Sequence, residues 1–112
     1  MDHKKIKIGI VGLGYVGLPL AVEFSRHFDV IGFDKNKNRV KELSKNFDRT
    51  LELRDFKLLK NVKITSNPNH IKPCNVFIIT VPTPVDSSKK PDFAPLISAS
   101  QDVGKILKKN DL

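Results

Sequence analysis

Three glycines and one acid in the first third of the chain have the types and spacing needed to bind a dinucleotide. Gly12, Gly14 and Gly17 form a G-x-G-x-x-G pattern after an apolar run, and Asp34 ends the next apolar run. Gly12 would allow a sharp turn, Gly14 would leave the backbone open to a pyrophosphate, and Gly17 would let a helix lie close to the preceding strand. The first amides of that helix, at the positive end of its dipole, would bind the phosphates. The carboxylate of Asp34 would accept hydrogen bonds from the adenosine ribose and repel a 2′-phosphate, which predicts NAD rather than NADP.

This interpretation needs a strand, a tight turn, a helix and a second strand in that order, because a lone glycine pattern also occurs in ordinary turns. Apolar runs rich in β-branched residues predict the strands, and apolar residues at helical spacing predict the helices. Their alternation predicts an α/β fold of the Rossmann type, with a doubly wound parallel sheet of strand order 3-2-1-4. The predicted strands are 6–11, 30–33, 62–65 and 75–81, and the predicted helices are 15–26, 36–45 and 93–108.

Apolar residues at helical spacing should place one face of each helix on the sheet. Asp92 is expected to cap the last helix. Residues 46–61 are harder to interpret, and we expect a loop and a short helix packed on the surface. The inward residues are predicted to be Val16, Leu20, Ala21, Phe24 and Phe28 in and after the first helix, and Leu96, Ala99, Val103, Ile106 and Leu107 in the last.

Cys74 and His70 are the residues most easily mistaken for catalytic groups. Cys74 precedes the fourth strand, at the end opposite the predicted cofactor site, so we expect a small buried apolar residue rather than a nucleophile. His70 has no cysteine, carboxylate or second histidine at ligand spacing, so no metal site is predicted.

Four motifs in order give the chain a resemblance to a known family. They are Lys7 to Ala21, Gly32 to Asp34, Arg39 to Leu43 and Val81 to Pro84. Together they resemble the amino-terminal NAD-binding domain of the UDP-glucose/GDP-mannose dehydrogenase family. Residues 91–100 resemble the bacterial branch that oxidises UDP-N-acetylhexosamines for surface polysaccharide biosynthesis.

The resemblance implies which residues contact NAD. Beyond the three glycines and Asp34, it implies Tyr15 and Val16 in the glycine turn, Arg39 against the adenine or its ribose, and Thr83 lining the site. Two alternatives stay open from the residues alone: Arg39 could be an exposed cation, and Thr83 could merely satisfy the backbone of a rigid turn between Pro82 and Pro84.

The resemblance also implies a parent enzyme that oxidises the sugar C6 alcohol to a carboxylate, with two NAD in succession and a thiohemiacetal on a cysteine. That cysteine belongs to a downstream motif that these 112 residues lack. We therefore assign no catalytic residue, and expect the amino-terminal part (1–112) of a dinucleotide-binding domain without its substrate and catalytic domains. The fragment should bind NAD weakly, should not catalyse alone, and should leave its fourth strand as an unpaired edge.

Composition limits the possible partners. The net charge of +8 comes from lysines scattered along the chain without interleaved aromatics, so we expect solvated faces and neither a nucleic-acid nor a membrane partner. The apolar stretch near the amino terminus is too short and too rich in glycine to span a bilayer. A single cysteine suits a reducing cytoplasm. The parent is expected to bind a nucleotide sugar and to form a homodimer.

Two other functions remain open from the residues. A hydroxyacid or 6-phosphogluconate type dehydrogenase begins with a similar domain, although the motif from Val81 to Pro84 argues against it. A stand-alone module that senses NAD(H) without catalysis would need the same glycine turn.

Overall fold

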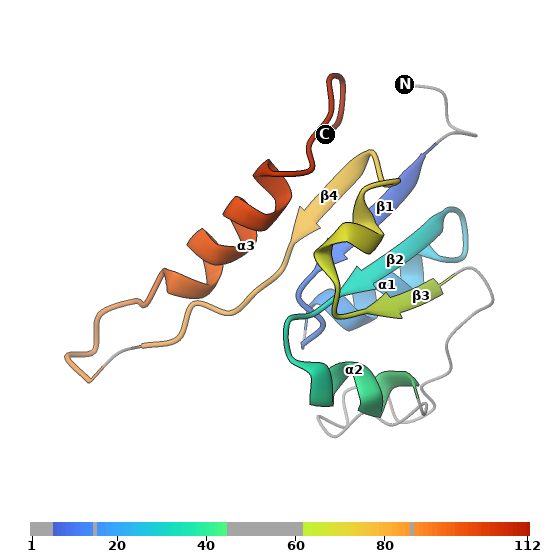
Figure 1. Cartoon of the computed structure of the whole chain (residues 1–112). Helices are drawn as coiled ribbons and strands as arrows, with labels where there is room; N and C mark the ends of the chain where they lie inside the picture. Colours follow the sequence, from blue (N-terminus) through green and yellow to red (C-terminus); the bar gives the residue numbers. More distant parts are fainter. Residues whose placement is uncertain (1–5, 15, 45–61, 86) are drawn as a thin grey trace.

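A four-stranded parallel sheet with helices on both faces forms the body of the molecule (Figure 1). The computed structural model describes residues 6–14, 16–44, 62–85 and 87–112. The strand order is β3-β2-β1-β4, so the predicted Rossmann-type topology is confirmed. The elements in chain order are β1 (Lys7–Val11), α1 (Gly17–Phe24), β2 (Asp29–Phe33), α2 (Lys37–Ser44), β3 (Val62–Thr65), the 3₁₀ helix η2 (Pro68–Ile71), β4 (Val76–Ile79) and α3 (Ala94–Gly104).

The two central strands are apolar on both faces because helices cover both sides of the sheet. In β1 and β2 every residue after the first is buried. Gly9 of β1 pairs with Ile31 of β2 on one side and with Phe77 of β4 on the other. The register brings the ends of β1, β2 and β4 to the same edge of the sheet.

Two hydrophobic clusters fill the space between the sheet and its helices. Leu18 and Ala21 of α1 and Leu43 of α2 pack with Ile10 and Val30 on one face. On the other face Ile71, at the end of η2, and Ala99, Val103 and Ile106, in and after α3, pack with Val11 and Phe33. Right-handed crossovers explain this division, because the chain moves outward from β1 to β3 and then returns to β4 on the opposite side.

Three residues predicted to face inward are exposed: Val16, Leu96 and Leu107. The predicted inward position of Leu96 is wrong, because this residue lies in the first turn of α3 with 36% of its surface exposed. The predicted inward position of Val16 is wrong: α1 begins at Gly17, and Val16 lies before it with 59% of its surface exposed. Leu107 is also wrongly placed, at 50% exposed, because α3 ends at Gly104 and the helical spacing no longer applies after it. Asp92 does cap the start of α3, since its Oδ1 accepts a hydrogen bond of 2.9 Å from the amide of Ala94.

The outer edge of β4 carries one parallel pairing, so the expectation of a wholly unpaired edge is wrong at this position. The amide of Leu112 donates to the Asn75 carbonyl at 2.8 Å, and the amide of Phe77 donates to the Leu112 carbonyl at 2.7 Å. Lys108 fixes the preceding turn, because its Nζ donates to the carbonyls of Lys72 and Cys74 at 2.6 and 3.0 Å. The rest of the outer edge has no strand neighbour among the described residues.

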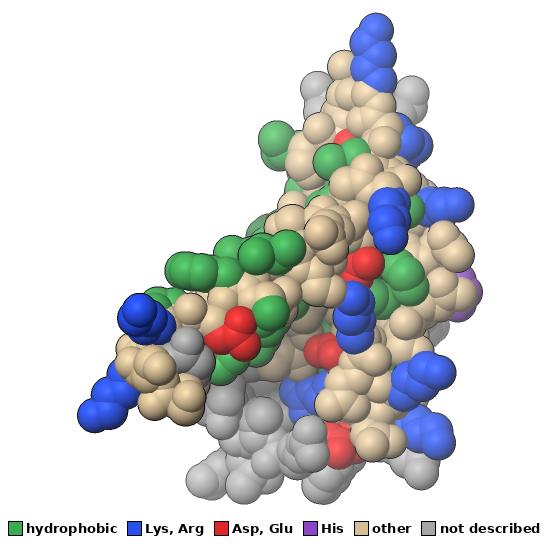
Figure 2. All heavy atoms as spheres, turned by 60° about the vertical axis from the view of Figure 1, so that its left-hand side comes forward, with side chains coloured by type: hydrophobic (Ala, Val, Ile, Leu, Met, Phe, Trp, Pro, Cys, Tyr) green, Lys and Arg blue, Asp and Glu red, His purple; other side chains and the backbone are tan. Residues whose placement is uncertain are grey.

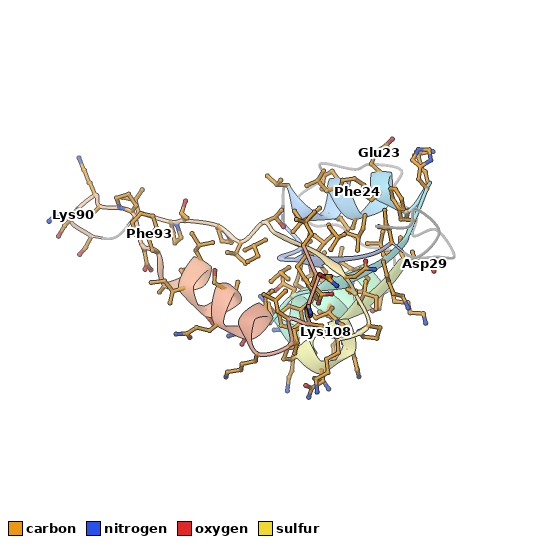
Figure 3. The ribbon with its side chains drawn as sticks, turned by 90° about the horizontal axis from the view of Figure 1, so that it is seen from above. Glu23, Phe24, Asp29, Lys90, Phe93 and Lys108 are labelled. Atoms are coloured by element: carbon orange, nitrogen blue, oxygen red, sulfur yellow. The ribbon has the colours of Figure 1, made fainter. Side chains whose placement is uncertain are left out.

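The β4–α3 connection and the start of α3 extend away from the sheet (Figures 1 and 3). Lys90 and Phe93 lie at the far end of this arm, on the side of the molecule away from Glu23 and Phe24 of α1 (Figure 3). No helix in the described ranges has the length and apolar character that crossing a membrane requires. The predictions for Tyr15 and for residues 46–61 lie outside the described residues.

Candidate functional site

A cavity of about 460 Å³ opens at the carboxyl ends of β1, β2 and β4. Ligands of doubly wound sheets bind at the carboxyl ends of the strands, at the point where the strand order reverses and two neighbouring strands are connected to opposite sides of the sheet. Here β1 and β4 are those strands, and the turn after β1 forms the floor of the cavity. The lining residues come from four segments: Val11 to Gly14, Phe33 to Asn36 with Arg39, Thr80 to Pro82, and Pro95, Ser98, Ala99 and Asp102 of α3.

Gly12 makes the sharp turn that the sequence predicts. Its φ of +106° lies in a region that side chains rarely adopt, and a Cβ built there would come within 2.9 Å of the Val81 nitrogen. Its amide donates to the Phe33 carbonyl at 2.8 Å, which extends the β1–β2 ladder by one bond. The turn therefore requires glycine both for its dihedral angle and for its contact with the residues that follow β4.

Gly14 and Gly17 have the two different environments that their predicted roles demand. A Cβ at Gly14 would meet no atom of the described residues within 4 Å, so the described structure leaves the backbone there open for a ligand. A Cβ at Gly17 would lie 1.7 Å from the Gly12 carbonyl oxygen, so α1 rests directly on the turn. The amides of Gly14 and Val16 have no acceptor in the part of the chain that the structure describes. Such free amides at a helix start suit an anionic oxygen.

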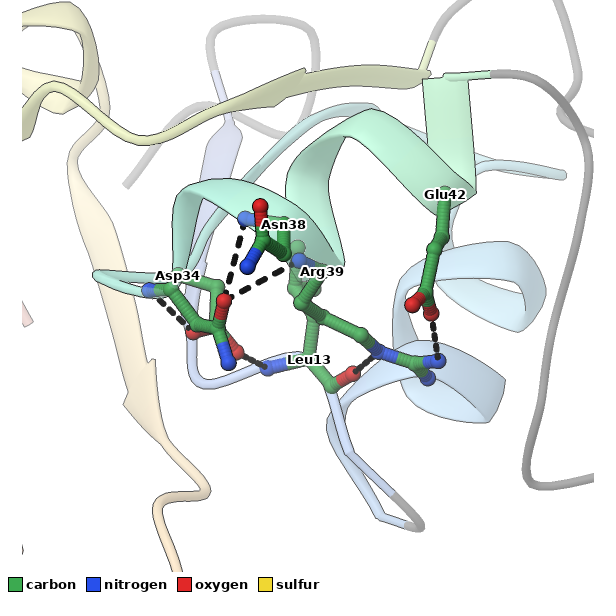
Figure 4. Close-up of polar contacts among 6 residues, drawn as sticks. Leu13, Asp34, Asn38, Arg39 and Glu42 are labelled. Atoms are coloured by element: carbon green, nitrogen blue, oxygen red, sulfur yellow. Dashed lines mark hydrogen bonds and ion pairs between the residues drawn. The ribbon is translucent and has the colours of Figure 1, made fainter.

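Asp34 is held at the mouth of the cavity by three hydrogen bonds, and Figure 4 shows the one between its carboxylate and the Leu13 amide. Its Oδ2 accepts from the Leu13 amide at 2.9 Å, its Oδ1 accepts from the Asn36 amide at 2.9 Å, and its own amide donates to the Thr65 carbonyl at 3.1 Å. Each carboxylate oxygen has a second lone pair, so Asp34 can also accept from two vicinal hydroxyls. The structure thus joins the glycine turn and the acid through one direct hydrogen bond.

Arg39 lies beneath the glycine turn and is not an exposed cation. It is 5% exposed, and its Nε donates to the Leu13 carbonyl at 2.7 Å (Figure 4). Its Nη1 lies 3.8 Å from Oε2 of Glu42, one turn later in α2. Arg39 also lines the cavity, and its predicted contact with the adenine or its ribose stays a prediction.

Thr83 is exposed and does not line the cavity, whereas Thr80 does. The Thr80 hydroxyl donates to the Gly12 carbonyl at 2.7 Å, and the Thr80 amide donates to the Val11 carbonyl at 2.8 Å. Thr80 therefore fixes the glycine turn to the end of β4. The sequence held one signal that could have identified Thr80: it is a hydroxyl residue directly after an apolar strand. The predicted contact of Thr83 with NAD remains a prediction.

Sequence reasoning also missed a polar bridge across the cavity. Lys35 follows Asp34, and its Nζ forms an ion pair of 3.0 Å with Oδ2 of Asp102 on α3. The same Nζ donates to the hydroxyl of Ser98, one turn earlier in α3. Periodicity along the sequence could not reveal this bridge, because Lys35 is far in sequence from Ser98 and Asp102.

Cys74 is a buried residue outside the cavity lining. Burial raises the pKa of its thiol to about 11, so the thiol is protonated at neutral pH. The prediction of a small buried apolar residue is confirmed.

On the face shown in Figure 2, the basic side chains of the described residues are spread out rather than gathered in one patch. The face of the molecule that carries α3 shows Lys and Arg side chains distributed over its surface, and hydrophobic side chains along the arm (Figure 2). Phe93 and Ile97 are exposed apolar residues of the arm and of α3, at 53% and 55%.

Comparison with known proteins agrees with this geometry. The chain is 50% identical over 111 residues to UDP-N-acetyl-D-glucosamine 6-dehydrogenase of Pseudomonas aeruginosa, covering 97% of this chain and 26% of that protein. It is 52% identical over 101 residues to the protein CapL of Staphylococcus aureus, covering 89% of this chain and 24% of CapL. The structure of UDP-D-ManNAc dehydrogenase from Pyrococcus horikoshii superposes with a TM-score of 0.83 at 30% identity, covering 96% of this chain and 27% of that one.

The chain thus spans about a quarter of the length of the curated relatives it matches. The model of the UDP-glucose/GDP-mannose dehydrogenase family, NAD binding domain, matches residues 6–112. With its glycine turn, its fixed acid and this match over nearly the whole chain, the protein belongs to the NAD-binding domain of the UDP-glucose/GDP-mannose dehydrogenase family.

Proposed function

We propose that this chain holds the adenosine diphosphate half of NAD for a nucleotide-sugar 6-dehydrogenase that acts on a UDP-N-acetylhexosamine. The observation that carries the proposal is the position of Asp34, whose carboxylate is bonded to the amide of Leu13 inside the glycine turn. Asp34 would hold the ribose, and the open backbone at Gly14 would leave room for the pyrophosphate next to it. The residues present therefore fit the group that the family binds.

The chain's own residues divide the work of binding. The amides that open α1 would stabilise the charge of the phosphates, and the Asp34 carboxylate would accept hydrogen bonds from the ribose hydroxyls. Thr80 and Arg39 keep the turn in place from two sides, through the carbonyls of Gly12 and Leu13. Bound NAD would accept a hydride from the C6 carbon of the sugar. The described part of this chain supplies binding and orientation for that step.

The substrate class is proposed from the relatives and from residues 91–100. Identities near 50% to two UDP-N-acetyl-D-glucosamine 6-dehydrogenases favour that substrate over UDP-glucose. We also propose that the longer protein works in the cytoplasm, forms a homodimer and supplies uronic acid sugars for surface polysaccharides. Its catalytic groups would lie in the part of the relatives that this chain does not cover.

Calorimetric titration of the purified chain with NAD and NADP tests cofactor binding. We expect weak but measurable binding of NAD and at least tenfold weaker binding of NADP. Asp34→Ala should weaken NAD about 10- to 100-fold, because charge-assisted hydrogen bonds contribute roughly 1.5–3 kcal/mol. Asp29→Ala is the matched control, since Asp29 is an exposed acid at the opposite end of β2. Equal affinity for both cofactors, or no effect of Asp34→Ala, would contradict the assignment.

A second experiment separates the proposed activity from its alternatives. The full-length protein that carries this chain should reduce NAD with UDP-N-acetylhexosamines and release the uronic acid. Reduction of NAD with 6-phosphogluconate or a hydroxyacid would support the related dehydrogenases instead. NAD binding with no turnover on any of these substrates would support a sensing module.

A further inference from the structure

We propose that Asp102 and Ser98 on α3 are remote determinants of the preference for NAD over NADP, because they bind the ammonium group of Lys35 and so keep it from pairing with a 2′-phosphate beside Asp34. This inference rests on the binding of a dinucleotide at the cavity described above. It goes beyond the role of Asp34, which acts on the ribose directly.

Lys35 stands where a phosphate-binding residue would be placed. It follows Asp34 directly, and both residues line the cavity at the end of β2. A lysine ammonium is a mobile point charge on a flexible four-carbon stem, and it binds phosphates readily. A cation next to Asp34, the carboxylate proposed to bind the ribose, would offset the repulsion between that carboxylate and a 2′-phosphate. Lys35 could therefore weaken the discrimination that Asp34 provides.

In the structure the Lys35 ammonium is engaged elsewhere. Its Nζ lies 3.0 Å from Oδ2 of Asp102 and donates to the Ser98 hydroxyl. Asp102 is well placed to hold it, because its side chain is 16% exposed and lines the cavity from α3. The Lys35 side chain is 58% exposed, so it has room to swing when its partners on α3 are removed.

The bridge also sets the charge near the ribose. With Asp102 present, the positive charge of Lys35 is neutralised at α3, and Asp34 acts as an uncompensated anion toward a 2′-phosphate. Without Asp102, Lys35 becomes a cation available on the same loop. Its attraction to a dianionic phosphate would be larger than to the neutral 2′-hydroxyl of NAD.

The test is the ratio of the dissociation constants for NADP and NAD, measured by calorimetry on the 112-residue chain at low and high salt. We expect Asp102→Asn to lower this ratio about fivefold, the size expected of one partly exposed charge contact. In a Lys35→Gln background the same substitution should change the ratio less than about twofold. Ser98→Ala, which keeps the ion pair, should lower the ratio by a smaller factor, and raised salt should reduce both effects.

Asp29→Asn is the control for charge alone, since it removes one negative charge at the far end of β2. An equal fall of the ratio in Asp29→Asn, or a fall in Asp102→Asn that persists without Lys35, would overturn the proposal while leaving NAD binding intact. If the chain without substitutions binds neither NAD nor NADP, the proposed cofactor site is wrong, and this inference is wrong with it. Circular dichroism should show the native spectrum for each variant. If Asp102→Asn does not fold, Ser98→Ala decides, because an unchanged ratio in that variant would then overturn the proposal.

Discussion

Single residues in this site are constrained by contacts with backbone atoms. Gly12 is required by its positive φ, and Gly17 by the Gly12 carbonyl oxygen, which occupies the space where a side chain would begin. Backbone atoms cannot rotate away as a side chain can, so these two positions tolerate substitution poorly. Gly32 is also restricted, since a Cβ there would lie 2.8 Å from Cδ2 of the buried Leu13 side chain.

Gly17→Ala should destabilise the chain by about 3 kcal/mol or more, because a methyl group there forces α1 away from the turn. Urea unfolding monitored by circular dichroism measures the effect. Gly104→Ala is the matched control, since it lies at the end of α3 with open space around it. That substitution should be neutral or stabilising by up to about 1 kcal/mol. Equal effects of the two substitutions would contradict the close contact.

The buried thiol of Cys74 makes a prediction about alkaline pH. Its pKa is raised from 9.0 to about 11 by burial, so the unfolded chain loses the proton first as the pH rises. The free energy of unfolding should therefore fall between about pH 9 and 11, while below pH 9 this contribution is fully present.

The decisive comparison for the thiol is with Cys74→Ala. The alanine variant has no thiol and should show a shallower fall in stability over the same interval. Urea unfolding at several pH values measures both slopes. Parallel curves for the two proteins would show that the thiol ionises equally in both states.

At the scale of elements, short polar links hold the ends of the strands and helices in register. Thr80 ties the end of β4 to the turn after β1, and Asn36 caps α2 through Oδ1, which accepts from the amides of Asn38 and Arg39. Lys108 closes the turn after α3 on the carbonyls that precede β4. These links position the elements, while the apolar clusters supply most of the stability.

Lys108→Met should loosen the turn after α3 and weaken the pairing of Leu112 with β4. We expect the free energy of unfolding to fall by only about 1 kcal/mol, because the hydrogen bonds that Lys108 Nζ donates are partly exposed to solvent. Hydrogen exchange of the Phe77 amide, which donates to Leu112, should become faster. Lys109→Met is the neighbouring control and should leave that amide unchanged. Unaltered exchange in Lys108→Met would mean that the turn holds without the lysine.

At the scale of the whole molecule, burial is concentrated in the centre of the sheet, and we expect stability to follow it. The molecule measures 46 × 36 × 19 Å, and the β4–α3 connection extends from one side (Figure 1). β1 and β2 are buried on both faces, whereas α3 presents only Ala99, Val103 and the following Ile106 as buried side chains. Helices with so little buried surface open locally at a lower free energy than central strands.

Native-state hydrogen exchange should therefore show α3 exchanging before β1 and β2. Addition of NAD should slow exchange in α3, because Ser98 and Asp102 line the cavity. Mass spectrometry of peptides from the three elements measures both effects. If α3 and β1 are equally protected from exchange in the absence of NAD, the centre of the sheet is not the most stable part of the molecule.

The amino-acid sequence by itself determined the fold and the core of the site. Apolar runs, helical spacing and the three glycines are local patterns, and they predicted the strand order, the turn and the position of Asp34 after β2. Local patterns failed near the ends of the helices: Val16 and Leu107 lie just outside the regular segments, and Leu96 is exposed in the first turn of α3.

Only the tertiary structure decided how distant segments meet. The bonds from Arg39 to Leu13 and from Thr80 to Gly12, and the bridge from Lys35 to Asp102, all join residues from different elements. No spacing along the chain encodes such contacts, because they depend on the register of the sheet and on the packing of α2 and α3. The sequence therefore predicts the cofactor of this domain, and the packing of its elements decides which distant residues lie beside the glycine turn and Asp34.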